Sequence, residues 1–321
     1  MDVSLFYTLA KKNNIVLPDE PCFASASALN DRYQNFSGLD DYLHYNAIGT
    51  SVLIYKEDFE AAVWSYFQHA KADGVAHVDM FFSPQAHVSR GVSVETVVKG
   101  FSAAQKRANG LGVTSSLVPC LLRHLPPEEG YTTYTSLVDG LRNGTFSGMG
   151  LSSTEKVNHT SQFAPIFKEA AQQGFNLTAH VAEEGTVDNI SVAVHGMGVK
   201  RIDHALKLRL DRDLMDEVVR QGILVTMCPL SNQALKCVTE ISELPVRTYL
   251  DAGVRFSINS DNPGYLGHYT LDNYLAVQKA FQLTHKEWIS VLRNSIMASW
   301  CSQERKDELL IALADVAKMF S

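Results

Sequence analysis

The sequence lacks the features that mark several large classes of protein. Its five cysteines are odd in number and scattered, and no C-x-x-C pair occurs, so we expect reduced thiols in a cytoplasmic or nuclear protein and no disulfide framework. No run of basic residues is longer than a pair and the net charge is -7, which argues against nucleic acid and membrane surfaces as partners. No apolar run approaches the roughly 20 residues that span a bilayer, and the first residues do not resemble a secretory signal.

A phosphate-binding turn is also missing. No G-x-G-x-x-G segment follows an expected strand, and the nearest candidate, Gly148-Met-Gly150, does not complete the pattern. This absence argues against an open α/β sheet that binds a dinucleotide.

What the sequence contains is a repeated alternation of short apolar runs and longer helical patterns. The apolar runs cover residues 75–82, 113–122, 148–151, 177–182, 201–205, 223–228 and 254–259. The helical patterns include residues 5–13, 92–109, 162–173 and 214–221. Such an alternation predicts a parallel sheet with helical crossovers, so we expect a TIM-like (β/α)8 barrel of class α/β in a single domain, residues 1–321. Because the chain opens on a helical pattern, the first strand of this barrel is missing.

Side chains that can bind a metal or move a proton follow the later apolar runs. His180 and Glu183 close one run, His204 closes the next, and Asp261 follows the last. Because the active sites of such barrels lie at the carboxyl ends of the strands, we expect these groups to meet at one rim. Imidazoles and carboxylates gathered in this way suit a hydrolytic metal site, whereas any one of them alone is more often a hydrogen-bonded strand cap.

The segments around these residues resemble a known family. HVAEEG at 180–185, RIDH at 201–204, CPLSN at 228–232 and SINSD at 257–261 are similar to the signature segments of the adenosine and adenine deaminases, which are zinc-dependent aminohydrolases. LAKKNNI at 9–15, FF-x-PQ-x-H at 81–87 and LRHLP at 122–126 resemble the adenine deaminases of fungi. The resemblance covers almost the whole chain.

The resemblance implies roles for the four rim residues. His180 and Asp261 would be ligands of one zinc ion. Glu183 would protonate the purine ring nitrogen as water attacks the carbon that bears the amine, and His204 would orient this water and help to deprotonate it. A carboxyl group that remains partly neutral is needed for the first of these steps.

The resemblance also implies a substrate. We expect hydrolytic deamination of adenine to hypoxanthine and ammonia, as in purine salvage, with adenosine or another N6-substituted purine as the alternative. Gly150 would approach this small-molecule purine through its backbone. Asn262 occupies the position of a ring-contacting aspartate, and its amide can donate the same hydrogen bond.

The sequence departs from the family pattern in two respects. It contains no H-x-H pair, although in the family such a pair at the end of the first strand supplies two further zinc ligands. Ala182 and Ala205 stand where the pattern has glycine, and Ser152 stands where it has aspartate. We therefore expect either a deaminase that is active in a longer form or by another arrangement of ligands, or an inactive, N-terminally truncated barrel that retains at most a purine pocket.

Overall fold

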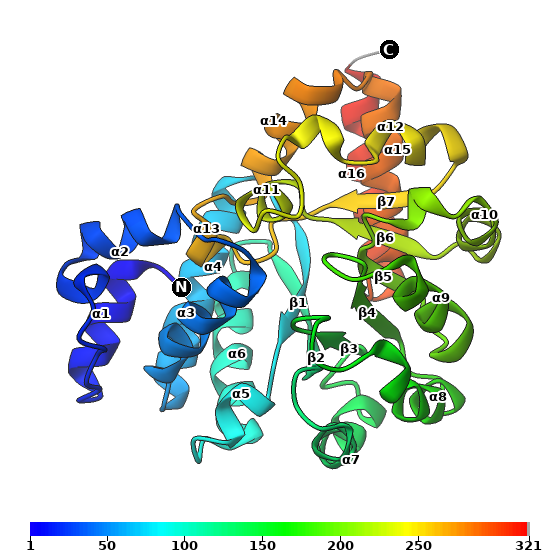
Figure 1. The fold of residues 1–321 in the computed structure, drawn as a ribbon. Coiled ribbons are helices and arrows are strands. Elements are labelled where there is room, and N and C mark those ends of the chain that lie inside the picture. Colours follow the sequence, from blue (N-terminus) through cyan, green and yellow to red (C-terminus); the bar gives the residue numbers. More distant parts are fainter. Residues whose placement is uncertain (320–321) are drawn as a thin grey trace.

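Seven parallel strands form the centre of the molecule. The structure is a computed structural model that describes residues 1–319. The strands form one curled sheet in the order β1-β2-β3-β4-β5-β6-β7, with helices around its outer face (Figure 1). They are β1 (His77–Phe82), β2 (Thr114–Leu122), β3 (Met149–Ser152), β4 (Leu177–Val181), β5 (Arg201–His204), β6 (Leu224–Met227) and β7 (Arg255–Ile258). This arrangement confirms the predicted α/β barrel class.

The sheet does not close into a ring. Each strand pairs with its neighbours in sequence, and no strand within residues 1–319 pairs with the outer edge of β1 or β7. The sequence predicted this gap, because the apolar run that would form the first strand is missing. Strands β5 and β6 are buried at every position, as expected of parallel strands that are covered on both faces.

The crossover helices follow the predicted order, and short 3₁₀-helices, labelled η, lie between some of the α-helices. The helices are α1 (Val3–Lys12), η1 (Pro21–Ala24), α2 (Ala26–Tyr33), α3 (Leu39–Ser51), α4 (Lys56–Ala72), α5 (Gln85–Val88), α6 (Val94–Asn109), α7 (Pro127–Arg142), η2 (Thr160–Gln162), α8 (Ala164–Gln172), α9 (Val187–Gly196), η3 (Leu208–Leu210), α10 (Arg212–Gln221), α11 (Pro229–Ala234), η4 (Ile241–Glu243), α12 (Val246–Ala252), α13 (Pro263–Leu266), α14 (Thr270–Phe281), α15 (His285–Ala298) and α16 (Gln303–Lys318). The pattern expected at 162–173 forms an α-helix only from Ala164, because Pro165 has no backbone N–H and fits the first turn. Among the described helices, none is long and apolar enough to cross a membrane.

Aromatic side chains join the N-terminal helices to the segment after β7. The ring centroid of Tyr265 in α13 lies 5.4 Å from that of Tyr33 in α2 and 5.6 Å from that of Tyr42 in α3. Tyr33 also stacks on Phe36 at 5.7 Å. All four rings are buried, and each pair adds roughly 0.5–1.5 kcal/mol to the burial of its apolar area. The cluster therefore holds α3 beside the carboxyl end of β7.

A buried ion pair crosses the interior of the sheet. Nη2 of Arg201, the first residue of β5, lies 2.7 Å from Oδ2 of Asp79 on β1, although these strands are not neighbours. Nε2 of His77 lies 3.1 Å from Oδ1 of Asp79, and the guanidinium of Arg201 lies 4.1 Å from the ring centroid of Trp300. Burial alone would raise the pKa of Asp79, but Arg201 and His77 outweigh it and hold this pKa at about 2.

Asp79→Asn is expected to lower the free energy of unfolding by about 3–5 kcal/mol, because the guanidinium of Arg201 loses its buried counter-charge. The control is Asp139→Asn, the same change at a side chain that is 96% exposed, with an effect below about 0.5 kcal/mol.

The depressed pKa means that Asp79 stabilises the wild type above pH 3.8 and that this contribution disappears as the pH falls towards about 2. Urea denaturation measures both effects, and equal losses in the two variants would contradict them.

Candidate active site

The carboxyl ends of three strands bring the predicted rim residues together. His180 lies near the end of β4 with Glu183 in the turn after it, His204 ends β5, and Asp261 follows β7. All four line a cavity of about 780 Å³. Their predicted convergence on one rim is therefore present in the structure, and the volume is typical of a small-molecule site.

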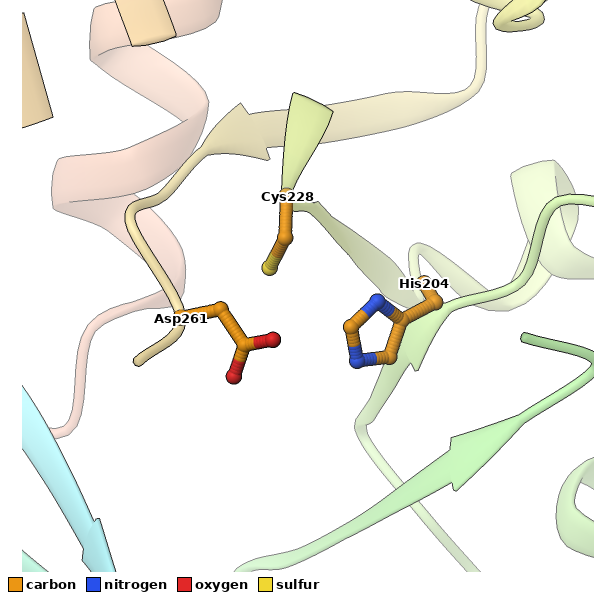
Figure 2. A group of neighbouring side chains, drawn as sticks. All are labelled: His204, Cys228 and Asp261. Carbon is orange, nitrogen blue, oxygen red and sulfur yellow. The ribbon is translucent and has the colours of Figure 1, made fainter. Parts of the chain in front are cut away.

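Three donor atoms of different kinds lie close together at this rim. A ring nitrogen of His204, Sγ of Cys228 and a carboxylate oxygen of Asp261 all lie within 4.8 Å of one another (Figure 2). Nitrogen, sulfur and oxygen are all donors that zinc accepts, so this group fits the metal that the resemblance implied. It contains Asp261, one predicted ligand, but not His180, the other. The sequence did not identify Cys228 as a donor, because a single cysteine after a strand has no partner at a diagnostic spacing.

The carboxylate of Asp203 orients His180. Nδ1 of His180 lies 3.1 Å from Oδ2 of Asp203, whose oxygens also accept hydrogen bonds from the hydroxyls of Thr178 at 2.7 Å and Thr226 at 2.6 Å. Although burial favours the neutral acid, His180, the hydroxyl of Thr226 and the charge of Arg201 hold the pKa of Asp203 well below its usual range. A carboxylate behind one imidazole nitrogen leaves the other nitrogen available to a metal, which suits the role predicted for His180.

Glu183, the predicted acid, is buried beside His204. Oε2 of Glu183 lies 3.6 Å from Nε2 of His204, and the Glu183 side chain is only 7% exposed. Burial raises the pKa of Glu183, and this effect exceeds the opposing attraction of His204. A carboxyl group in such an environment keeps its proton more readily near neutral pH, as a general acid requires.

Asn232 links these two side chains. Its Nδ2 lies 3.4 Å from Oε1 of Glu183 and 3.1 Å from Nδ1 of His204, and Asn232 is fully buried. Asn232 therefore contacts both the predicted acid and the residue predicted to orient the water. The sequence identified Asn232 as part of a motif but assigned it no role.

Asp261 is fixed by hydrogen bonds to both of its oxygens. Oδ2 accepts from Oγ of Ser231 and Oδ1 from Nδ2 of Asn262, each at 2.6 Å. Asn262, a predicted purine contact, therefore lines the cavity while its amide donates to Asp261. Gly150, the other predicted contact, lies within β3, where a Cβ would meet Sγ of Cys120 at 2.6 Å. The contacts of Gly150 and Asn262 with a purine stay predictions.

Two alanines at the rim have left-handed backbone conformations. The φ angle is 52° at Ala182, which follows β4, and 47° at Ala205, which follows β5. These are the positions at which the resemblance implied glycine, and glycine adopts this conformation at the lowest cost. Alanine is therefore strained here, by roughly 1–2 kcal/mol at each position.

A comparison with known families assigns the class of protein. A family model described as adenosine deaminase matches residues 1–316. The chain belongs to this adenosine deaminase family, which confirms the resemblance of the segments at the strand ends. Membership of this family implies that the protein binds a metal ion.

Curated relatives of the chain include fungal adenine deaminases. The chain is 47% identical to the adenine deaminase of Aspergillus oryzae, over 97% of this chain and 89% of the relative. It is 44% identical to that of Schizosaccharomyces pombe, over 99% and 88%. It is 41% identical to that of Saccharomyces cerevisiae, over 100% and 93%.

Solved structures have the same fold. The adenine deaminase from Arthrobacter aurescens matches with a TM-score of 0.92 at 31% identity, over 99% of this chain and 95% of that chain. An amidohydrolase from Burkholderia ambifaria with bound Zn matches with a TM-score of 0.87 over 99% of this chain and 87% of that chain. At 21% identity this second likeness shows the fold alone.

Ala182→Gly and Ala205→Gly are expected to leave the free energy of unfolding within about 0.5 kcal/mol of the wild type or to raise it, because relief of left-handed strain offsets the greater freedom of glycine in the unfolded chain. Ala179→Gly is the control. Ala179 is equally buried but lies inside β4, where the same change should cost about 1 kcal/mol or more. Urea unfolding of the three variants measures the difference, and three equal losses would mean that the two turns carry no strain.

Proposed function

We propose that the chain is a single-domain adenine deaminase, which converts adenine and water into hypoxanthine and ammonia. The observation that carries the proposal is the buried pair of Glu183 and His204, 3.6 Å apart, at the rim that also holds His180 and Asp261. We propose adenine as the substrate, and not adenosine or another N6-substituted purine, because relatives that match nearly the whole chain are named adenine deaminases.

In the proposed reaction, the oxygen of water bonds to the ring carbon that bears the amine. Glu183 gives a proton to the adjacent ring nitrogen, so that no localised negative charge develops on the ring. His204 accepts one proton of the water and passes it to the departing amine. The bond from carbon to the amine breaks, ammonia leaves, and the remaining hydroxyl proton restores Glu183. The burial of both side chains beside the cavity supports these roles, because it limits the directions in which their protons can move.

One zinc ion would be held by His180 and Asp261. When bound, zinc supplies the Lewis acidity that makes water a nucleophile near neutral pH. Asp203 behind His180 and the hydrogen bonds to both oxygens of Asp261 support the two residues as ligands. Sγ of Cys228 lies within 4.8 Å of a carboxylate oxygen of Asp261 and would add one donor atom to those of His180 and Asp261.

The purine would occupy the cavity at the rim, with Asn262 and Gly150 as proposed contacts. Asn262 lines the cavity and carries an amide that can both donate and accept, as the edge of a purine requires. Gly150 pairs in the sheet with Cys120, which lines the same cavity. Tyr42 of α3 also lines the cavity.

His180→Ala is expected to remove most of the zinc that the purified chain retains, because it deletes a ligand that Asp203 orients. Elemental analysis of the dialysed protein measures this loss. His195→Ala is the matched control, since His195 is a half-exposed histidine on α9 that pairs with Glu217 at 2.8 Å. An unchanged zinc content in His180→Ala would contradict the ligand assignment. A wild-type chain without zinc would favour the competing proposal, a barrel that retains a purine pocket but no turnover.

Glu183→Gln is expected to lower kcat for adenine by about 10²–10⁴ with fold and zinc content unchanged, because the amide has the shape of the acid but no proton to give. The conversion of adenine to hypoxanthine is followed by ultraviolet absorbance. Glu184→Gln is the control, since Oε1 of Glu184 pairs with Nζ of Lys156 at 2.8 Å, and it should change kcat by less than about threefold. The reverse pattern would mean that the acid has been assigned one residue out of register.

A further inference from the structure

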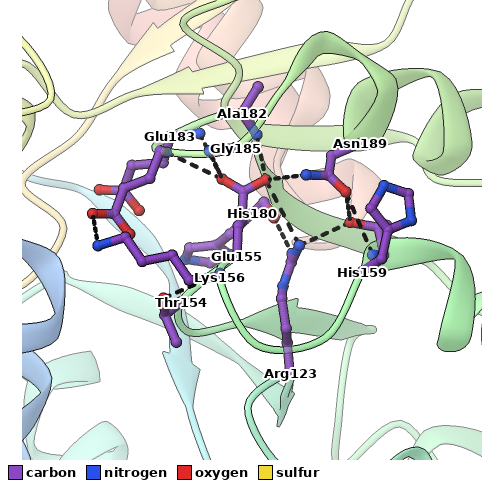
Figure 3. A network of polar contacts seen from close by, with 12 residues as sticks. Arg123, Thr154, Glu155, Lys156, His159, His180, Ala182, Glu183, Gly185 and Asn189 are labelled. Carbon is purple, nitrogen blue, oxygen red and sulfur yellow. Dashed lines mark hydrogen bonds and ion pairs between the residues drawn. The ribbon is translucent and has the colours of Figure 1, made fainter.

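A single buried carboxylate lies inside the turn that follows β4. Oε1 of Glu155, in the loop after β3, accepts the backbone N–H groups of Glu183 at 2.9 Å, Glu184 at 3.2 Å and Gly185 at 3.0 Å. Oε2 of Glu155 accepts the N–H of Ala182 at 2.8 Å. The Glu155 side chain is 2% exposed. Four consecutive backbone donors therefore converge on one side chain (Figure 3).

Arg123 and Asn189 hold the same carboxylate from the other side. Nη1 of Arg123 lies 3.7 Å from Oε2 of Glu155 and donates to Oγ1 of Thr160 at 2.8 Å. Nδ2 of Asn189 donates to Oε2 of Glu155 at 2.9 Å, and Oδ1 of Asn189 accepts from Oγ1 of Thr160 at 2.7 Å. Arg123 also donates through Nη2 to the backbone oxygen of His180. The network thus contacts the backbone of the proposed zinc ligand as well as residues 182–185, which we call the acid segment.

The contact is so close that the last position of the acid segment has no room for a side chain. A Cβ on Gly185 would overlap Oε2 of Glu155 and would lie 2.5 Å from Nδ2 of Asn189. Gly185 is not among the residues with positive φ, so the position requires space and not an unusual backbone conformation. The approach of Glu155 therefore explains the glycine that ends the HVAEEG segment.

The two polar groups of Glu183 have different partners. Its backbone N–H faces Glu155, whereas its carboxyl group faces His204 at 3.6 Å and Asn232 at 3.4 Å. Glu155 therefore touches the residue on the side opposite to the proposed chemistry. A shift of the backbone at this point would move the carboxyl group of Glu183 relative to the cavity.

We propose that Glu155 is a positioning residue, which holds the acid segment so that the carboxyl group of Glu183 meets the purine ring nitrogen. This rests on the role proposed above for Glu183. The acid segment begins at Ala182, whose φ of 52° is strained and persists only where other contacts enforce it. Hydrogen bonds from four N–H groups to one carboxylate supply this enforcement, because bonds to an ionised acceptor are stronger than neutral ones.

Glu155→Gln tests the proposal. Both oxygens of Glu155 accept N–H donors, so an amide nitrogen meets a donor whichever way the side chain turns. The amide hydrogens of residues 182–185 should exchange on the order of tenfold faster or more. The kcat for adenine should fall about 10- to 100-fold while the KM changes less than about threefold and the zinc content is unchanged, as expected when only the acid is misplaced.

Asp58→Asn is the matched control. Asp58 is another fully buried carboxylate that accepts backbone N–H groups, from Ile54 at 3.1 Å and Tyr55 at 2.9 Å, at the start of α4. Its loss should lower the stability of the protein, but it should leave kcat and the exchange of residues 182–185 unchanged. This comparison separates the positioning of the acid from a general loss of buried hydrogen bonds.

Gly185→Ala is the second test variant. It keeps every charge but places a methyl group where the carboxylate of Glu155 lies, so kcat and amide protection should fall in the same direction. If Glu155→Gln does not fold, the kcat and the amide exchange of Gly185→Ala test the positioning role of Glu155. A folded Glu155→Gln with wild-type kcat, or with residues 182–185 still protected, would overturn the proposal. A wild-type chain without deaminase activity would count against the proposed function alone, since the exchange measurement still decides whether Glu155 holds the acid segment.

Discussion

The carboxylate of Asp203 is the contact on which the arrangement of the rim depends. Asp203 lies on β5 and accepts hydroxyl hydrogen bonds from Thr178 of β4 and Thr226 of β6, so one side chain joins three strands. The parallel register sets His180 opposite Asp203. Because a buried carboxylate is costly unless its lone pairs are used, a slip of either neighbouring strand would leave it unsatisfied. This register brings the imidazole ring centroids of His180 and His204 within 5.2 Å of each other at the rim.

The parts of the molecule that could be predicted from the sequence are those that depend on local pattern. The alternation of apolar and helical segments indicated the parallel sheet, and position at a strand end identified His180, Glu183, His204 and Asp261. The contacts of Glu155 could not be predicted in this way. Its contacts with residues 182–185 join positions that are 27 to 30 residues apart and lie in irregular segments, where no periodicity relates the partners.

A comparison of residue types within motifs does not show whether a substituted residue keeps the same backbone conformation. Ala182 and Ala205 differ from glycine in residue type, yet both keep the left-handed backbone that glycine would adopt. Tertiary contacts around the two turns therefore override the local preference of alanine. The sequence around Cys228 gave no indication that its sulfur is a metal donor. Only the fold shows that this sulfur lies near His204 and Asp261.

In the open sheet, a side-chain contact joins two strands that the backbone does not pair. Since β1 and β7 do not pair with each other within residues 1–319, hydrogen bonding around a ring does not set the curvature of the sheet. The ion pair of Arg201 and Asp79 spans the interior from the first residue of β5 to the third residue of β1. A charge pair, and not backbone hydrogen bonding, therefore connects the first strand of the sheet to the fifth.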